Sequence, residues 1–371
     1  MSFHLVSRIA PQQYISEKGA YDYLAGILKK LSVRRVLFLH GIKSLHKAAP
    51  YLPDLAQAGI ETFGMSFGGE CSPQEIDRVI QAIKTHDADL IIGLGGGKVM
   101  DTAKASAYKA GRLPLVLMPT MASNCAAWSA LSVFYKDNGE SIGFQTFPNQ
   151  SALVLVEPRV ILDSPIEYFI AGIADTLAKW YESNGLLAKV DQNHLAILYA
   201  RESAKLCHDI PLEYAVQAVD DMRQGILSNA WNTVMETNIM ASGLVGGFAD
   251  QYGSATAAHS VHDALTFFPE TKPILHGVKV AYGIMVQLAL EGKWDEIRRL
   301  QPFYQKLNLP MNLTDLHLGT RPESDIRQLA ARAVSPDKTI HLLPYEVTAE
   351  SVFSAINQLE TLSAHRKEGK A

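Results

Sequence analysis

Residues 90–104 read LIIGLGGGKVMDTAK, and this stretch decides the fold that the sequence predicts. A buried β-strand over residues 88–93 runs into glycines at positions 93, 95, 96 and 97, and a helix follows at once. Glycine lets the backbone take positive φ angles and lets phosphate oxygens approach the amides. A helix N-terminus also favours anions. The stretch therefore predicts a pyrophosphate site, although a plain tight turn would also explain the glycines. The residues expected to contact the phosphates here are Gly95, Gly96, Gly97, Lys98 and Asp101.

Short apolar strands alternate with helices on both sides of this stretch. Strands are expected at residues 35–40, 61–65, 113–118 and 152–158, and helices at residues 44–58 and 73–86. This alternation predicts a parallel sheet with helices on both faces and a ligand site at the carboxyl ends of its strands. Thr120 and Ser123 follow the strand at 113–118, so they are expected on the ligand side.

After residue 162 the strand signals stop and helical patterns take over. A chain of 371 residues is long enough for two domains. We therefore expect an α/β nucleotide-binding domain over residues 1–162 and an all-helical, metal-binding catalytic domain over residues 163–371. In the first helix of the second part, Asp175 lies off the apolar stripe, and its neighbours one turn away are mostly small. This leaves room for a ligand beside the carboxylate, with a solvated helix face as the alternative.

Three histidines lie in two consecutive predicted helices of the second part. His259 and His262 are three residues apart and so share a helix face, and His276 lies in the first turn of the next helix. Two helices joined by a short loop can aim their imidazoles at one point, and neutral imidazole is the commonest protein ligand for transition metals. The spacing alone is equally compatible with histidines buried in the core.

Composition excludes several classes of protein. The net charge is −4 and there is no basic block, which argues against a nucleic-acid or anionic-membrane partner. Three scattered cysteines do not form a disulfide framework or a thiolate zinc site. The sequence has no signal peptide, and no apolar run reaches the roughly 18 residues of a membrane span. These features predict a soluble, reduced, cytoplasmic protein that acts on a small molecule.

Several motifs, taken in order, resemble the glycerol dehydrogenase branch of the iron-containing alcohol dehydrogenases. They are GGGKVMDTAK at 95–104, PTMAS at 119–123, SALSVFY at 129–135 and FGGECS at 67–72. The likeness extends over nearly the whole chain. It implies an α/β N-terminal domain and an all-α C-terminal domain, a nicotinamide cofactor and a homo-oligomer. It also implies that the cofactor site includes Ser129, Leu131 and Tyr135.

The resemblance also decides between the two interpretations of the histidines. In the family, the aspartate ligand falls where this chain has Asp175, and His259 and His276 match the two histidine ligands. One carboxylate and two imidazoles leave a fourth position open, as in catalytic sites. Zinc is the first choice, as in similar glycerol dehydrogenases, and the ligand types do not exclude iron, manganese or nickel. His262 does not match a ligand and is expected to act as a proton relay or as a structural residue.

Cys125 departs from the glycerol dehydrogenase pattern, which has an aspartate in the substrate pocket at this position. The change removes an acceptor for polyol hydroxyls. It also removes a repulsion toward an anionic substrate of about 4 kcal/mol at 4 Å and an effective dielectric constant near 20. Residues 124–128, NCAAW, instead resemble the hydroxycarboxylate dehydrogenase subgroup, which reduces 2-oxo acids. We therefore expect interconversion of a 2-hydroxy acid, or a similar small alcohol, and its carbonyl form, with glycerol as the alternative substrate.

Gly41 is the second departure, because members that prefer NAD have an aspartate there to bind the ribose 2′-hydroxyl. With Lys43 nearby, a 2′-phosphate would meet no repulsion and a cation. This favours NADPH over NADH.

Two rival functions share parts of this pattern. A metal-dependent synthase of the dehydroquinate synthase type has the same two-domain plan, but it needs basic residues around a phosphorylated substrate, and the sequence around Cys125 and Trp128 is poor in them. A non-catalytic nucleotide-binding protein would not need Asp175, His259 and His276 together.

Overall fold

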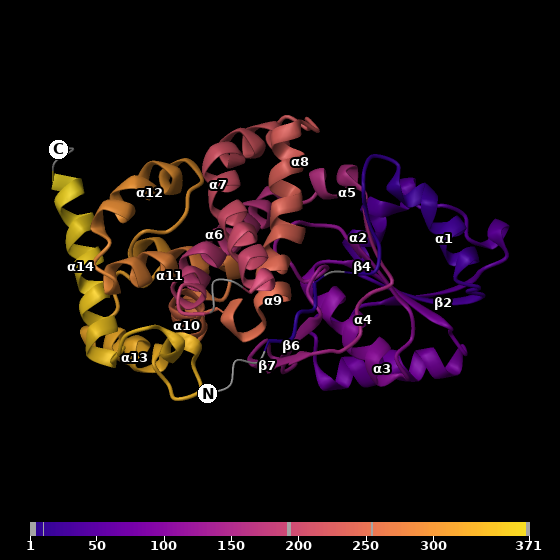
Figure 1. The fold of residues 1–371 in the computed structure, drawn as a ribbon, viewed down its shortest axis with the longest axis horizontal. Coiled ribbons are helices and arrows are strands. Elements are labelled where there is room, and N and C mark those ends of the chain that lie inside the picture. Colours follow the sequence, from indigo (N-terminus) through magenta and orange to yellow (C-terminus); the bar gives the residue numbers. More distant parts are fainter. Residues whose placement is uncertain (1–4, 10, 191–193, 254, 369–371) are drawn as a thin grey trace.

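The computed structural model describes residues 5–9, 11–190, 194–253 and 255–368. Figure 1 shows an α/β half on the right and a helical half on the left, the fold class that the sequence predicted. Within the described residues, all strands lie between Tyr14 and Val156, and the long helices begin at Ile166.

A six-stranded parallel sheet forms the centre of the α/β half. Its strands, in spatial order, are β1 (Tyr14–Ser16), β8 (Leu153–Val156), β5 (Leu115–Pro119), β4 (Leu90–Gly95), β2 (Arg35–His40) and β3 (Glu61–Ser66). A separate antiparallel hairpin consists of β6 (Leu131–Tyr135) and β7 (Ser141–Thr146). The helices of this half are α1 (Leu24–Lys30), α2 (Ile42–Ala48), α3 (Pro73–Thr85), α4 (Gly97–Lys109) and α5 (Pro158–Leu162).

Both faces of the sheet are covered, which is why its central strands are almost continuously apolar. In β4, Leu90 and Ile92 pack with residues of α1 and α2. Ile91 points the other way, into a cluster with residues of α3 and α4 that continues into the helical half through Phe169. The two predicted domains, 1–162 and 163–371, thus share one apolar core, and the boundary between them stays a prediction.

One predicted helix is shorter than expected. The apolar pattern suggested a helix over residues 44–58, but α2 ends at Ala48 and a short 3₁₀ turn follows at Ala49–Tyr51. Pro50 and Pro53 explain the difference, because proline lacks the backbone donor that continues an α-helix. The edge strand β1 was not expected from the sequence, and it pairs with β8.

The helical half packs its helices with their backbones in close contact. Its helices are α6 (Ile166–Leu187), α7 (Leu195–Arg223), α8 (Asn229–Glu236), α9 (Ser242–Ala249), α10 (Ala257–Leu265), α11 (His276–Leu290), α12 (Trp294–Lys306), α13 (Glu323–Ala333) and α14 (Ala349–Glu368). A Cβ atom on Gly277 of α11 would lie 1.9 Å from the carbonyl oxygen of Ala171 in α6. A Cβ atom on Gly172 of α6 would lie 2.0 Å from the carbonyl oxygen of Ala122, in the loop after β5. These two glycines let α6 touch both α11 and that loop.

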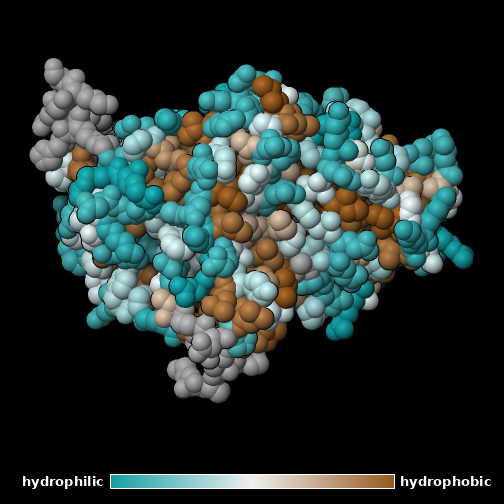
Figure 2. Space-filling model, turned by 45° about the horizontal axis from the view of Figure 1, so that its top comes forward, coloured by the Kyte–Doolittle hydropathy of each residue, from teal (hydrophilic) through white to brown (hydrophobic). Residues whose placement is uncertain are grey.

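The surface is mixed in character. Figure 2 shows hydrophilic residues over much of one face, with apolar residues gathered toward the middle of the molecule. None of the helices formed by the described residues combines the length and the apolar content that crossing a bilayer requires.

The contact between α6 and α11 predicts a specific sensitivity. Gly277→Ala should lower the free energy of unfolding by about 3 kcal/mol, because the methyl group overlaps backbone that has no room to move. Gly246→Ala is the matched control, since a Cβ on this exposed helical glycine meets nothing within 4 Å. The control should leave stability unchanged or raise it by about 0.5–1 kcal/mol. Urea titration measures both, and equal effects of the two substitutions would contradict the prediction.

Candidate metal and dinucleotide site

The carboxyl ends of three neighbouring strands, β2, β4 and β5, lie side by side where the dinucleotide was expected. His40 at the end of β2 pairs with Leu94 of β4, and Gly95 of β4 pairs with Pro119 of β5. The residues that follow these strands are therefore neighbours, and they include Gly41, Gly96 and Thr120. The Thr120 hydroxyl lies 2.9 Å from that of Ser44, and Ser123 is half-buried in the loop beyond.

The glycine cluster does not adopt the positive φ angles that glycine allows. Gly96 is the N-cap of α4 with a φ of −88°, and none of Gly93, Gly95, Gly96 and Gly97 has a positive φ. The glycines therefore supply no positive φ angles here. Close packing explains the cluster instead, since a Cβ on Gly97 would lie 2.8 Å from the side chain of Asn124. No side chain caps the N-terminus of α4, so its backbone N–H groups remain suited to binding an anion.

Lys98 and Tyr135 lie together beside this loop. The Lys98 ammonium is 2.6 Å from a carboxylate oxygen of Glu70 and 5.0 Å from the centre of the Tyr135 ring. The structure thus brings together two residues that were expected in the cofactor site, and it adds an acidic partner that the sequence analysis did not use.

Asp101 points into the protein rather than to the edge of the sheet. Its carboxylate pairs with the Lys104 ammonium at 2.9 Å and accepts a hydrogen bond from the backbone N–H of Val133. Burial raises the pKa of Asp101, and Lys104 acts against this. Lys104 also donates to the carbonyl oxygens of Ser129 and Leu131. This buried pair therefore anchors the chain segment that was expected to contact the cofactor.

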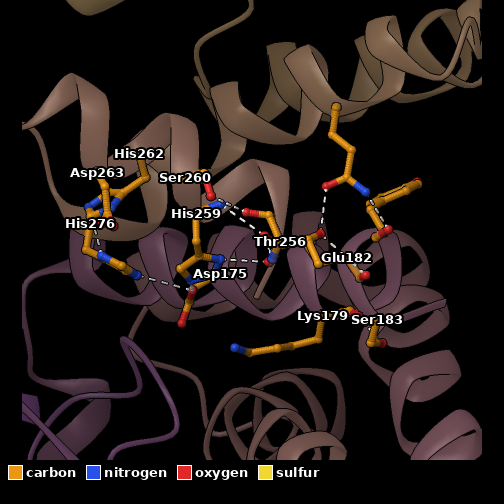
Figure 3. A network of polar contacts seen from close by, with 12 residues as sticks. Asp175, Lys179, Glu182, Ser183, Thr256, His259, Ser260, His262, Asp263 and His276 are labelled. Atoms are coloured by element: carbon orange, nitrogen blue, oxygen red, sulfur yellow. Dashed lines mark hydrogen bonds and ion pairs between the residues drawn. The ribbon is translucent and has the colours of Figure 1, made fainter. Parts of the chain in front are cut away.

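Asp175, His259 and His276 converge from three helices, α6, α10 and α11 (Figure 3). The Oδ1 atom of Asp175 lies 3.3 Å from Nε2 of His259 and 3.4 Å from Nε2 of His276. Ligand atoms at about 2.0–2.1 Å from a tetrahedral zinc ion are about 3.3 Å apart. Among the described residues these three form the one group of metal-ligating side chains close enough to share an ion. Their spacing fits a cation.

The Asp175 carboxylate is buried, ionised and incompletely paired. Burial opposes its charge, but the neighbouring His259 and His276 and the charge of Lys179 hold the pKa of Asp175 well below its usual value. The side chain is 4% exposed, and Oδ1 has no hydrogen bond of good geometry. A buried carboxylate oxygen without a partner is costly unless a cation occupies the space beside it.

Glu182 orients His259. This carboxylate is 1% exposed, lies 2.6 Å from Nδ1 of His259 and accepts hydrogen bonds from the backbone N–H groups of Thr256 and His259. Burial raises and His259 lowers the pKa of Glu182, with a net shift below its usual value, so the group is an ionised acceptor. It therefore accepts a hydrogen bond from Nδ1 of His259, which leaves Nε2, beside Asp175, as the nitrogen that can bind a metal.

A second hydrogen-bond chain orients His276. Its Nδ1 atom lies 2.9 Å from Nε2 of His262, and Nδ1 of His262 lies 3.1 Å from a carboxylate oxygen of Asp263. Burial and the neighbouring His276 lower the pKa of His262 to about 3, so this imidazole is neutral. It donates to Asp263 and accepts a hydrogen bond from Nδ1 of His276, which leaves Nε2 of His276, beside Asp175, as the nitrogen that can bind a metal.

Sequence reasoning missed four residues that surround this centre: Lys179, Glu182, Asn238 and Asp263. Lys179 and Glu182 lie one and two helical turns after Asp175, so their positions on the same helix face could have revealed them. Asn238 had no such signal. It lies in a π-helical turn between α8 and α9, where its side chain bonds to Thr176 at 2.9 Å and to the Ala122 carbonyl at 3.0 Å. It thereby ties α6 to the loop that carries Cys125, which is half-buried and forms no disulfide.

The contact between Glu182 and His259 predicts the effect of a conservative change. Glu182→Gln should weaken zinc binding by about 10- to 100-fold, because the amide is a poorer acceptor for the His259 proton. Glu167→Gln, an exposed position in the first turn of the same helix, should leave zinc affinity unchanged. Competition with a chromophoric chelator measures both dissociation constants, and an unchanged value for Glu182→Gln would refute the role of Glu182.

Comparison with known proteins identifies the family. Residues 11–158 match the model of the iron-containing alcohol dehydrogenases. The chain is 34% identical over 362 residues to hydroxycarboxylate dehydrogenase A of Escherichia coli K12, covering 96% of this chain and 98% of that protein. It is 36% identical over 368 residues to a glycerol dehydrogenase of Thermotoga maritima, covering 98% and 99% of the two chains.

Solved structures agree with this assignment. A probable glycerol dehydrogenase from Sinorhizobium meliloti superposes with a TM-score of 0.87 at 30% identity, over 98% of this chain and all of that one. The glycerol dehydrogenase of Schizosaccharomyces pombe gives 0.89 at 28% identity, over all of this chain and 94% of that one. The chain is therefore an oxidoreductase of the metal-dependent alcohol dehydrogenase type and belongs to the iron-containing alcohol dehydrogenase family.

Proposed function

We propose that this protein transfers hydride between a nicotinamide cofactor and a small 2-oxo acid or 2-hydroxy acid at one divalent metal ion held by Asp175, His259 and His276. The observation that carries the proposal is the convergence of an ionised, buried carboxylate with two imidazoles whose Nε2 atoms lie 3.3 and 3.4 Å from it. Such a donor set offers one anionic and two neutral ligands and leaves room for a substrate oxygen, as catalytic metal sites do.

Zinc is the metal we propose, with iron, manganese and nickel as the alternatives that these ligands also accept. A divalent cation in this position supplies Lewis-acid polarisation of the substrate oxygen. The protein holds the three ligands at the required spacing, with Glu182 and His262 fixing the imidazole orientations. His262 joins His276 to Asp263, and we propose that it positions the His276 imidazole; a proton relay along the same two hydrogen bonds is the alternative.

The edge of the sheet supplies the cofactor side of the reaction. We propose that the diphosphate lies at the N-terminus of α4, near Gly95, Gly96 and Gly97, with Thr120, Ser123 and the segment from Ser129 to Tyr135 beside it. A reduced nicotinamide held there would supply the hydride for the carbonyl carbon, and water would supply the proton for the oxygen, so that the carbonyl becomes a hydroxyl.

The substrate class is inferred from the loop after β5. Cys125 is half-buried there, close enough to Lys179 for an electrostatic interaction. A thiol gives polyol hydroxyls no anionic acceptor and gives a carboxylate no repulsion. The similarity to hydroxycarboxylate dehydrogenase A supports a 2-oxo acid, and that to a glycerol dehydrogenase keeps glycerol as the alternative. The family match supports a dehydrogenase over a synthase or a non-catalytic protein.

We propose NADPH as the preferred cofactor. Gly41 is the N-cap of α2, immediately after β2, and it presents no carboxylate to the ribose. Lys43 is exposed two residues later. NADH is the alternative.

We also propose a homo-oligomer in the cytoplasm. The outer face of α7 exposes four apolar side chains at helical spacing, namely Leu195, Leu198, Tyr199 and Leu206. An apolar stripe of this kind on a surface helix is typical of an interface between protein chains.

Metal removal provides the main test. Dialysis against a chelator should abolish carbonyl reduction, and added zinc should restore it. Asp175→Asn should lower kcat/KM by about 1000-fold and resist restoration, because about 4 kcal/mol of charge stabilisation is lost. Glu167→Gln, treated in the same way, should recover fully. Full turnover by the chelated wild-type protein, or by Asp175→Asn, would overturn the proposed function.

Cofactor preference gives an independent test. The wild-type protein should show a higher kcat/KM with NADPH than with NADH. Gly41→Asp should move the ratio toward NADH by at least about 10-fold, because a carboxylate binds the 2′-hydroxyl and repels a 2′-phosphate. Aspartate is also a favourable N-cap, so α2 should tolerate the change. Equal or better efficiency of the wild type with NADH would show that the NADPH proposal is wrong.

A further inference from the structure

Lys179 is a cation near the proposed metal site, but it has no part in holding the metal. It lies on α6 one turn after Asp175, and its side chain extends beneath Asp175 in Figure 3. Its ammonium group forms no hydrogen bond and no ion pair of 4.0 Å or less with the residues that the structure describes, although the side chain is only partly accessible. Because the side chain is half-buried and not enclosed, a ligand can reach these three donors.

The surroundings keep this lysine charged. Burial opposes the charge, but Asp175 foremost, then Cys125 and Glu182, hold the pKa of Lys179 above its usual value. Lysine is protonated at neutral pH even without such help. A free ammonium group therefore lies beside the proposed metal ligands.

The charges around the centre do not balance. A divalent cation and Lys179 would bring three positive charges, while Asp175 and Glu182 bring two negative ones. The charge of Asp263 is balanced by Lys338, 3.0 Å away. The imidazoles are neutral when their Nε2 atoms are ligands. Cys125, the neighbour of Lys179 on the loop after β5, is not a carboxylate, so it does not supply the missing negative charge. One positive charge remains for a ligand to neutralise.

We propose that Lys179 binds the carboxylate of the substrate and thereby selects 2-oxo and 2-hydroxy acids over neutral carbonyl compounds and alcohols. The inference rests on the proposed function, since it assigns a residue to the substrate of that reaction. In a 2-oxo acid the carboxylate is bonded directly to the carbonyl carbon. Lys179 can therefore hold the carboxylate with a charge-assisted hydrogen bond while the carbonyl oxygen lies next to the Asp175 side of the site.

A purely structural lysine would behave differently. If Lys179 served only to offset the charges of Asp175 and Glu182, its removal would lower metal content and would slow anionic and neutral substrates alike. A residue that binds a carboxylate acts on anionic ligands alone, and its effect appears in the binding of an unreactive anion as well as in turnover.

The test compares pyruvate with 2,3-butanedione, which has an acetyl group in place of the carboxylate. Lys179→Met keeps the length of the stem and removes the charge. It should lower kcat/KM for pyruvate about 100-fold, or about 2.7 kcal/mol at 1.36 kcal/mol per tenfold change, and alter that for 2,3-butanedione less than about 3-fold. Lys179→Arg should recover part of the loss. Lys189→Met, at an exposed position just after α6, is the matched control and should change neither.

Binding of oxamate, an unreactive analogue of pyruvate, gives a readout apart from turnover. Calorimetry on the zinc- and cofactor-loaded protein should show a dissociation constant at least about 10-fold higher for Lys179→Met and for Lys179→Gln than for the wild type. Zinc content, measured by mass spectrometry, should be equal in all variants. Loss of zinc, equal losses for both substrates, or unchanged oxamate affinity would each overturn the role of Lys179.

The proposed function can fail separately. A wild-type protein that oxidises glycerol far faster than it reduces any 2-oxo acid refutes the substrate class, whatever the variants do. Oxamate binding still decides the inference in that case, because a wild-type site that does not bind oxamate has no carboxylate-binding lysine. If the wild type reduces pyruvate and Lys179→Met does so equally well, the function stands and the assignment of Lys179 falls.

Discussion

The structure depends most on how it stabilises one buried carboxylate, that of Asp175. Asp175 is ionised inside the protein, and one of its oxygens lacks a hydrogen bond of good geometry. A negative charge in such a place needs positive charge close by, because water cannot solvate it. The two Nε2 atoms directed at Asp175 meet that need only if they are protonated or if all three groups share a cation. The hydrogen bonds on their far sides fit a shared cation, since an Nδ1 donor leaves Nε2 as the nitrogen that binds a metal.

That arrangement depends on how closely the helices approach. Asp175, His259 and His276 come from three different helices, so their separations of 3.3 and 3.4 Å are set by backbone packing. Gly277 allows α11 to rest on the backbone of α6, and Gly172 allows α6 to rest on the loop after β5. The proposed metal ligands, Lys179 and the carboxyl ends of the strands are thus linked through the backbone of α6.

Asp101 and His262 hold neighbouring groups in place, although their residue types suggest direct contact with a ligand. Asp101 follows the glycine cluster, yet its carboxylate pairs with Lys104 beneath β6 and leaves the edge of the sheet to others. His262 shares a helix face with His259, yet it supports the ligand on the neighbouring helix. Asp101 and Lys104 hold the loop before β6, and His262 holds the imidazole of His276. Without these buried polar partners the loop and the imidazole would be free to take other orientations.

The sequence by itself determined the fold class, the alternation of the central strands with helices in the first half and, through the family resemblance, the identity of the three converging residues. Strand periodicity and the family motifs are local properties of the chain, so they can be recognised without coordinates. Tertiary structure alone decided that the glycine cluster serves close packing, that Asn238 joins α6 to the loop after β5, and that Lys179 lacks a partner. These features depend on contacts between segments far apart in the chain, such as the 116 residues between Asn238 and Ala122. A spacing pattern reports which side chains share a helix face, whereas only the packed backbone determines what that face meets.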